Sequence, residues 1–116
     1  MNTNFEYGKT FLKIGEKNIT FTLNIRDVKQ AGQFVVALLE VPNGDDTLNN
    51  IYAYDLNGKL KWQVQPVTEK FSDLVNPLPY ENMFCEDNKI SASDFYGRKF
   101  WIDLETGKLL DFKASR

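Results

Sequence analysis

The carboxylates of Asp55, Asp94 and Asp103 are the side chains of this sequence best suited to acid–base chemistry. The chain contains no histidine, which excludes Ser-His, Cys-His and His-metal arrangements together with the commonest general base. Each of the three aspartates lies beside a predicted turn, where aspartate caps backbone amides and faces a lysine across the hairpin. We therefore assign these carboxylates to structure and expect no catalytic residue. A carboxylate-based enzyme is the alternative.

Metal and cofactor chemistry is weakly supported. Asn43–Asp46 and Glu86–Asn88 are rich in oxygen ligands, but neither has the alternating spacing and terminal glutamate of a calcium-binding loop. Cys85 is the only cysteine, which excludes an intrachain disulfide and is typical of a small core residue. No glycine pattern of a phosphate site is present. We expect no metal and no cofactor.

Length and composition favour one domain over residues 1–116. Of the 116 residues 42% are hydrophobic, including nine Phe, five Tyr and two Trp, which is enough for a core. A formal charge of −2 and the lack of a basic run argue against a nucleic-acid partner. Met1–Glu6 lacks the start of a secretory signal and no stretch is long and apolar enough for a membrane helix, so we expect a cytoplasmic protein with no membrane partner.

The segment Asn50–Gln65 carries the strongest structural signal, a hairpin. Asn57-Gly58, preceded by Asp55, supplies the residues of a three-residue loop that ends in a left-handed position. This loop pairs Asp55 with Lys59 and, further along, Tyr52 with Trp62. The expected apolar face then consists of Tyr52, Tyr54, Leu60, Trp62 and Val64.

Short strands are predicted along most of the chain. Phe34–Val41 is apolar on both faces, so we expect a central strand covered on each side. Arg26–Gly32 is predicted to be a connection, and Thr68–Val75 a helix of two turns. The other strands are expected at Phe11–Ile14, Asn18–Ile25, Met83–Cys85, Lys89–Asp94, Arg98–Asp103 and Lys108–Phe112.

One sequence pattern occurs twice. Tyr54-Asp55-Leu56-Asn57-Gly58-Lys59-Leu60 recurs as Ile102-Asp103-Leu104-Glu105-Thr106-Gly107-Lys108-Leu109. The pattern resembles the outer hairpin of quinoprotein-type (PQQ-like) β-propeller repeats, and this resemblance implies blade-like meanders. Two copies are too few to close a propeller. The chain as a whole also resembles the short acidic proteins of large uncharacterised bacterial families, some of which are immunity partners of secreted toxins.

The expected fold class is therefore all-β with at most one short helix. We predict antiparallel meanders of about eight or nine strands in two blade-like sheets, packed as a sandwich or open barrel and not as a closed propeller.

Aromatic residues give the only positive indication of a binding site. Counted outward from the second repeat's turn, Trp101, Leu110 and Phe112 share the face opposite Phe100. Because aromatic-rich strands usually belong to a core, we expect the N-terminal segment or Pro66–Glu81 to cover this face; the alternative is an exposed binding surface. Loop residues expected at its rim are Tyr80, Phe95, Tyr96 and Arg98.

These observations favour a non-enzymatic domain that binds another protein, of the immunity or adaptor type. The alternative is a small-ligand-binding protein or carboxylate-based enzyme with a pocket between its sheets. A homo-oligomer joined through a free edge strand is a third possibility.

Overall fold

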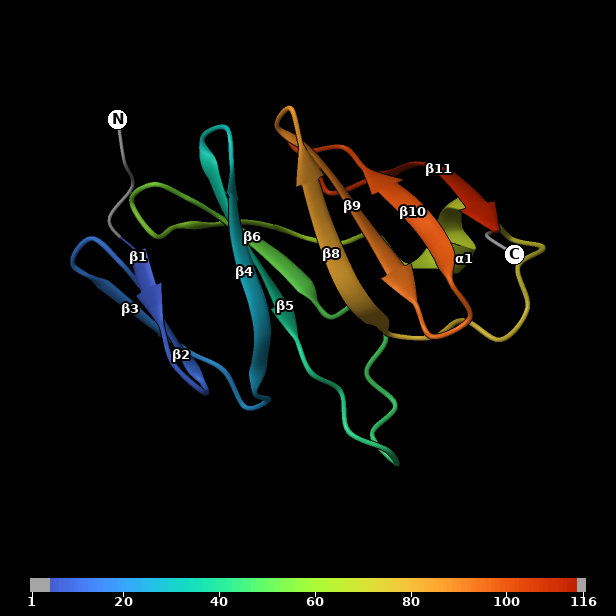
Figure 1. Cartoon of the computed structure of the whole chain (residues 1–116), viewed down its shortest axis with the longest axis horizontal. Coiled ribbons are helices and arrows are strands. Elements are labelled where there is room, and N and C mark those ends of the chain that lie inside the picture. The colour runs from blue at the N-terminus through green and yellow to red at the C-terminus, as the bar shows by residue number, and fades with distance from the viewer. Residues whose placement is uncertain (1–4, 115–116) are drawn as a thin grey trace.

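Residues 5–114 form three antiparallel sheets in the computed structural model of the chain (Figure 1). Within this range there are eleven strands and one short helix, without a closed barrel or propeller. The predicted all-β class is confirmed, with one sheet more than expected. Met1–Asn4 lies outside the described residues. It makes up most of Met1–Glu6, the stretch in which no secretory signal was found.

Each sheet is a meander in which strands adjacent in sequence are paired in space, as predicted. The N-terminal sheet consists of β1 (Phe5–Tyr7), β2 (Phe11–Ile14) and β3 (Lys17–Thr20). The middle sheet consists of β4 (Ile25–Ala31), β5 (Phe34–Leu39), β6 (Ile51–Asp55) and β7 (Leu60–Gln63). The C-terminal sheet consists of β8 (Tyr80–Glu86), β9 (Lys89–Asp94), β10 (Arg98–Ile102) and β11 (Leu109–Ala114).

Strand β5 is central, and all of its residues are buried, as its apolar sequence predicted. Alternate side chains point to opposite faces of a strand, so β5 contributes to two cores. Val35, Ala37 and Leu39 pack with Leu12 and Ile14 of the N-terminal sheet. Phe34, Val36 and Leu38 pack with Phe100 and Ile102 of the C-terminal sheet. The middle sheet is therefore covered on both faces.

Three sequence-based element predictions are wrong. The strand expected over Asn18–Ile25 is divided, because β3 ends at Thr20 and β4 begins at Ile25. Arg26–Gly32 is largely strand β4 rather than a connection, because the segment pairs with β5 although only Val28 and Ala31, three positions apart, are buried within it. The predicted helix over Thr68–Val75 is reduced to a single turn, α1 (Val67–Lys70), which follows Pro66. Beyond it, Phe71 and Leu74 pack against the core between the middle and C-terminal sheets.

The hairpin of β6 and β7 has the predicted turn but not the predicted register beyond it. Tyr54 pairs with Leu60 as expected, whereas Trp62 pairs with Ala53 instead of Tyr52, since Lys61 is an extra residue that forms a bulge. Trp62 is therefore buried on the face of Ala53, opposite to Tyr52, and Leu60 is exposed. The same bulge occurs in β11, where Leu110 is the extra residue between the pairs Trp101–Asp111 and Ile102–Leu109.

Polar side chains join the middle sheet to the C-terminal sheet. The buried amide of Asn50 donates to the carbonyls of Leu39 and Tyr80 at 2.7 and 2.9 Å and accepts the Tyr80 amide at 2.9 Å. The Trp62 indole N–H donates to the Leu104 carbonyl at 2.7 Å. The Trp62 ring lies against Gly107, and a Cβ added at Gly107 would be only 2.6 Å from the ring carbons. Strand β7 is thus packed against the second repeat's turn, whereas Gly58 of the first repeat's turn lies against Lys17.

Candidate functional site

The three candidate acid–base aspartates are all used to hold turns. Asp55 Oδ1 accepts the amides of Asn57 and Lys59 at 2.9 and 3.0 Å. These hydrogen bonds, first that of Lys59, lower the pKa of Asp55 below its usual value. Asp103 accepts the Glu105 amide and the Thr106 hydroxyl. The predicted capping role is confirmed.

Asp94 is held more tightly than the other two. Its Oδ1 accepts the amides of Tyr96 and Arg98, both at 3.0 Å, and its Oδ2 accepts the Arg98 Nε–H at 2.7 Å. The remaining guanidinium nitrogens donate to the carbonyls of Val75 and Asn76 at 2.8 and 2.7 Å. Arg98 therefore ties the loop before β8 to the turn between β9 and β10.

The turn at Asp94 matches the first repeat's turn and was missed in the sequence. Asp94-Phe95-Tyr96-Gly97-Arg98 and Asp55-Leu56-Asn57-Gly58-Lys59 share an aspartate, a glycine three residues later and then a basic residue. Both glycines have positive φ, and both donate to the carbonyl of their aspartate, at 2.9 and 3.0 Å. The spacing Asp-x-x-Gly-Lys/Arg was the signal that would have found it.

The structure separates the predicted binding residues. Tyr80 is the first residue of β8 and is buried, and Phe112 is half-buried with its ring stacked on Phe100 at 5.3 Å. Placing Tyr80 on a loop was wrong, and so was placing Phe112 on the face of Trp101, because the bulge at Leu110 turns Phe112 inward. There Phe71 of the Pro66–Glu81 segment covers Phe112, with ring centres 4.8 Å apart. Leu110 itself is exposed on edge strand β11.

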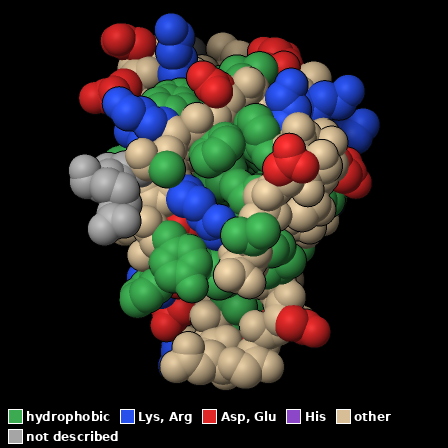
Figure 2. Space-filling view, turned by 90° about the vertical axis from the view of Figure 1, so that its right-hand side faces the viewer, with side chains coloured by type: hydrophobic (Ala, Val, Ile, Leu, Met, Phe, Trp, Pro, Cys, Tyr) green, Lys and Arg blue, Asp and Glu red, His purple; other side chains and the backbone are tan. Residues whose placement is uncertain are grey.

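Phe95 and Tyr96 lie at the tip of the turn between β9 and β10, with 78% and 55% of their surfaces exposed. The Tyr96 ring lies 5.2 Å from the Arg98 guanidinium carbon. A groove of about 540 Å³ is lined by Arg98, Phe112 and the segment after α1. Figure 2 views the molecule from this end and shows hydrophobic side chains gathered around a hollow.

Trp101 lies on the outward face of the C-terminal sheet, which we call the aromatic face and define by Phe84, Ser91, Lys99 and Trp101. Inward Phe100 and Ile102 place Lys99 and Trp101 on the opposite side of β10. Phe84, Ser91 and Trp101 form one row across β8, β9 and β10. Lys99 Nζ lies 4.7 Å from the centre of the Phe84 ring and 5.4 Å from that of the Trp101 ring.

The expected cover over Trp101 is not found. Phe71 and Leu74 of the Pro66–Glu81 segment pack on the inner side of the C-terminal sheet, and the N-terminal sheet packs on the middle sheet. Phe84 is 41% exposed, whereas Ser91 between the two aromatic residues is only 5% exposed. The sequence analysis missed Phe84 and Lys99. Strand alternation from the inward Met83 was the available signal for Phe84.

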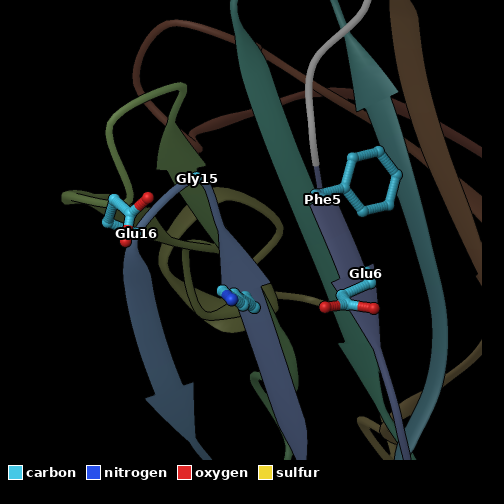
Figure 3. Close-up of a pocket in the computed structure, with 5 residues that line it drawn as sticks. Phe5, Glu6, Gly15 and Glu16 are labelled. Carbon is cyan, nitrogen blue, oxygen red and sulfur yellow. The ribbon is translucent and has the colours of Figure 1, made fainter.

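A carboxylate-based enzyme of the expected kind would need a pocket between the middle and C-terminal sheets. Apolar side chains from both sheets, among them Trp62, Met83 and Phe100, occupy that space. A depression of about 390 Å³ lies instead on the N-terminal sheet. Figure 3 shows that its lining residues Glu16 and Phe5 lie on different elements and do not converge. Within residues 5–114, no three His, Cys, Asp or Glu side chains gather as a metal site would require.

Each core contains one buried tyrosine. Tyr54, in the core facing the N-terminal sheet, has its pKa raised to about 12 by burial and by the neighbouring Tyr52. Burial and nearby Asp94 raise the pKa of Tyr80 still further. The Tyr80 hydroxyl is buried without a hydrogen-bond partner among the described residues. The Tyr80 hydroxyl is therefore enclosed in the core between the middle and C-terminal sheets.

The comparisons with known proteins identify a family but not an activity. A family model described as a domain of unknown function (DUF7957) matches residues 2–114, so the chain belongs to this family. No curated protein and no solved structure matches the chain. In the described part of the chain, no helix has the length and apolar character needed to cross a membrane.

Proposed function

We propose that this member of the DUF7957 family is a non-enzymatic domain that binds another protein through its aromatic face, as an immunity or adaptor protein does. The observation that carries the proposal is the pairing of the exposed Phe84 with the half-buried Trp101 in one row on the outward side of the C-terminal sheet. Aromatic side chains are enriched at the centres of protein interfaces, where they supply most of the binding energy.

The position of the two aromatic rings argues against a purely structural role. Their strands already contribute Met83, Phe100 and Ile102 to the core on the other side of the sheet. The row containing Phe84 and Trp101 adds no side chain to that core, so its apolar surface is available to a partner. The distance across two strand spacings, roughly 10 Å, suits a flat contact with a polypeptide rather than a closed ligand pocket.

The C-terminal sheet is also rigid enough to present a preformed surface. Asn50 and Trp62 fasten it to the middle sheet with buried hydrogen bonds, and Arg98 fastens the adjacent loop. A partner therefore meets side chains whose backbone is already ordered, which lowers the entropic cost of binding. Phe95 and Tyr96, on the turn at one end of this sheet, extend the proposed surface.

The proposal is tested by co-purification of the tagged full chain from cells of its source organism. We expect a partner to be enriched by the wild type and by Phe11→Ala, which removes an exposed aromatic ring from the N-terminal sheet. The double variant Phe84→Ala/Trp101→Ala is expected to lose that partner by roughly thirtyfold or more, the effect of removing one or more hot-spot residues. Circular dichroism checks that all three proteins are folded. Equal enrichment by the double variant, or enrichment of nothing, would overturn the proposal.

Binding of a small ligand is the second candidate, and the groove of about 540 Å³ beside α1 is the observation in its favour. Its test is a thermal-shift screen of small molecules on the wild type and on Leu74→Trp, which narrows the groove. A compound that raises the melting temperature of the wild type alone would support this function. A screen without such a compound would remove it.

A further inference from the structure

Two lysines face each other across the C-terminal sheet without an acidic partner. Lys99 of β10 is paired in register with Lys113 of β11, and both side chains belong to the outward side of the sheet. Like charges directly opposite one another on a sheet destabilise it. The ion pairs found among residues 5–114 join Arg26 to Glu81, Lys29 to Asp27 and Arg98 to Asp94, and none involves Lys99 or Lys113.

Lys99 is held in place by aromatic rings rather than by a carboxylate. Its ammonium group lies over both Phe84 and Trp101, within the range of a cation–π interaction. Lys99 as a whole residue is half-buried there. A depression of about 260 Å³, lined by Phe84, Lys99 and Lys29, opens beside it.

The acidic groups near this face form no ion pair with the two lysines among residues 5–114. Asp111 lies on the same side of β11, and its Oδ1 accepts the Phe112 amide at 2.8 Å. Glu86 is opposite Lys89 and lines the same depression as Lys99. Lys29 is paired with Asp27 at 3.4 Å. On this side of the sheet Lys89, Lys99 and Lys113 outnumber Glu86 and Asp111, in a chain whose formal charge is −2.

From this charge pattern we infer that the partner of the aromatic face presents an acidic side chain, flanked by apolar ones, to Lys99 and Lys113. This inference rests on the proposed function and adds the chemical class of the partner's binding segment. The carboxylate relieves the repulsion between the two lysines, and the flanking apolar side chains cover Phe84 and Trp101. A nucleic acid is a poorer fit, because two unpaired lysines neutralise few phosphates and the chain as a whole is acidic.

The experiment is a selection of random twelve-residue peptides displayed on phage, carried out on the immobilised full chain. The wild type is compared with Lys99→Met/Lys113→Met, which keeps side-chain length and removes both charges, and with Lys13→Met as a control on the N-terminal sheet. We expect peptides selected by the wild type to be enriched in Asp or Glu next to an apolar residue. Their affinity is expected to fall about tenfold for the double variant and to be unchanged for Lys13→Met.

The outcomes separate this inference from the function on which it rests. Selection of neutral or basic peptides, whose binding is lost in the variant Phe84→Ala/Trp101→Ala, would contradict an acidic partner while supporting protein binding. No selected peptide from any variant would contradict both. A single-stranded DNA oligonucleotide is measured in parallel, and its binding more tightly than the acidic peptides would replace the inference by a nucleic-acid partner.

Discussion

The N-terminal and C-terminal sheets flank the same middle sheet but present different outward faces. On the N-terminal sheet the outward row is Glu6, Lys13 and Asn18, which suits a surface in contact with water. On the C-terminal sheet the equivalent outward row is Phe84, Ser91 and Trp101, with Lys99 beside it. Both sheets thus cover a face of the middle sheet, but the outward face of the N-terminal sheet is polar, whereas that of the C-terminal sheet is apolar and basic.

The two sheets also differ in how they are attached. The C-terminal sheet is joined to the middle sheet by a large core and by hydrogen bonds from Asn50 and Trp62. Among the described residues, the buried polar side chains are Asn50, Ser91 and Asp94, and none of them belongs to the N-terminal sheet. Buried polar networks fix a unique arrangement more strictly than apolar contacts do. The sheet with the aromatic face is therefore the one whose position is most strictly defined.

The largest loss of stability is expected from Asn50→Leu, which breaks the polar joint between the middle and C-terminal sheets. The change leaves the carbonyls of Leu39 and Tyr80 and the Tyr80 amide buried without partners, so we expect a loss of about 4 kcal/mol in the free energy of unfolding. Asn18→Leu on the exposed row of the N-terminal sheet is the matched control and is expected to stay within about 0.5 kcal/mol. Urea denaturation measures both. A loss below about 1 kcal/mol for Asn50→Leu would show that the joint does not depend on this amide.

A smaller effect is expected from the two related turns. Asp94→Asn removes the charge that neutralises the half-buried Arg98, and we expect it to cost about 2 kcal/mol in the free energy of unfolding. Asp55→Asn, in the exposed turn between β6 and β7, keeps the amide hydrogen bonds and is expected to cost much less. Because the folded-state pKa of Asp55 is lowered, its contribution is present above about pH 4 and is lost as the pH falls further. Denaturation at pH 7 and pH 3 tests both variants; equal losses at pH 7 would contradict the difference between the turns.

The smallest effect at neutral pH is expected from Tyr54→Phe in the core that faces the N-terminal sheet. The pKa of Tyr54 is raised to about 12, so the folded state keeps the neutral phenol while the unfolded chain ionises near pH 10. The wild type therefore loses stability as the pH rises from about 10 to 12, and the variant loses less. Thermal unfolding across this range provides the measurement. Parallel curves for the two proteins would show that Tyr54 ionises freely in the folded state.

Local patterns in the sequence predicted the strand content, the central position of Phe34–Leu39 and the turn at Asp55. They did not predict the bulges at Lys61 and Leu110. A bulge is defined by the pairing with the partner strand, so the hydrophobic alternation of one strand alone does not reveal it. The bulges reversed the expected faces of Trp62 and Phe112, and with Phe112 part of the candidate site.

Long-range contacts explain the other differences between prediction and structure. Asn50 has an ordinary loop sequence, and its role depends on Tyr80, thirty positions away. The ammonium of Lys99 over two aromatic rings likewise depends on the pairing of β8, β9 and β10. The prediction that Trp101 lies on the face opposite Phe100 came from alternation within one strand.

Photo-crosslinking from two matched positions is the most direct test of whether the C-terminal sheet carries the partner-binding surface. A photoreactive phenylalanine analogue is placed at Phe84 on the aromatic face or at Phe11 on the outward side of the N-terminal sheet, both of which are exposed. In cells of the source organism, we expect a discrete crosslinked protein from position 84 and none from position 11. A crosslink from position 11, or none from position 84, would contradict the assignment of the binding surface to the C-terminal sheet.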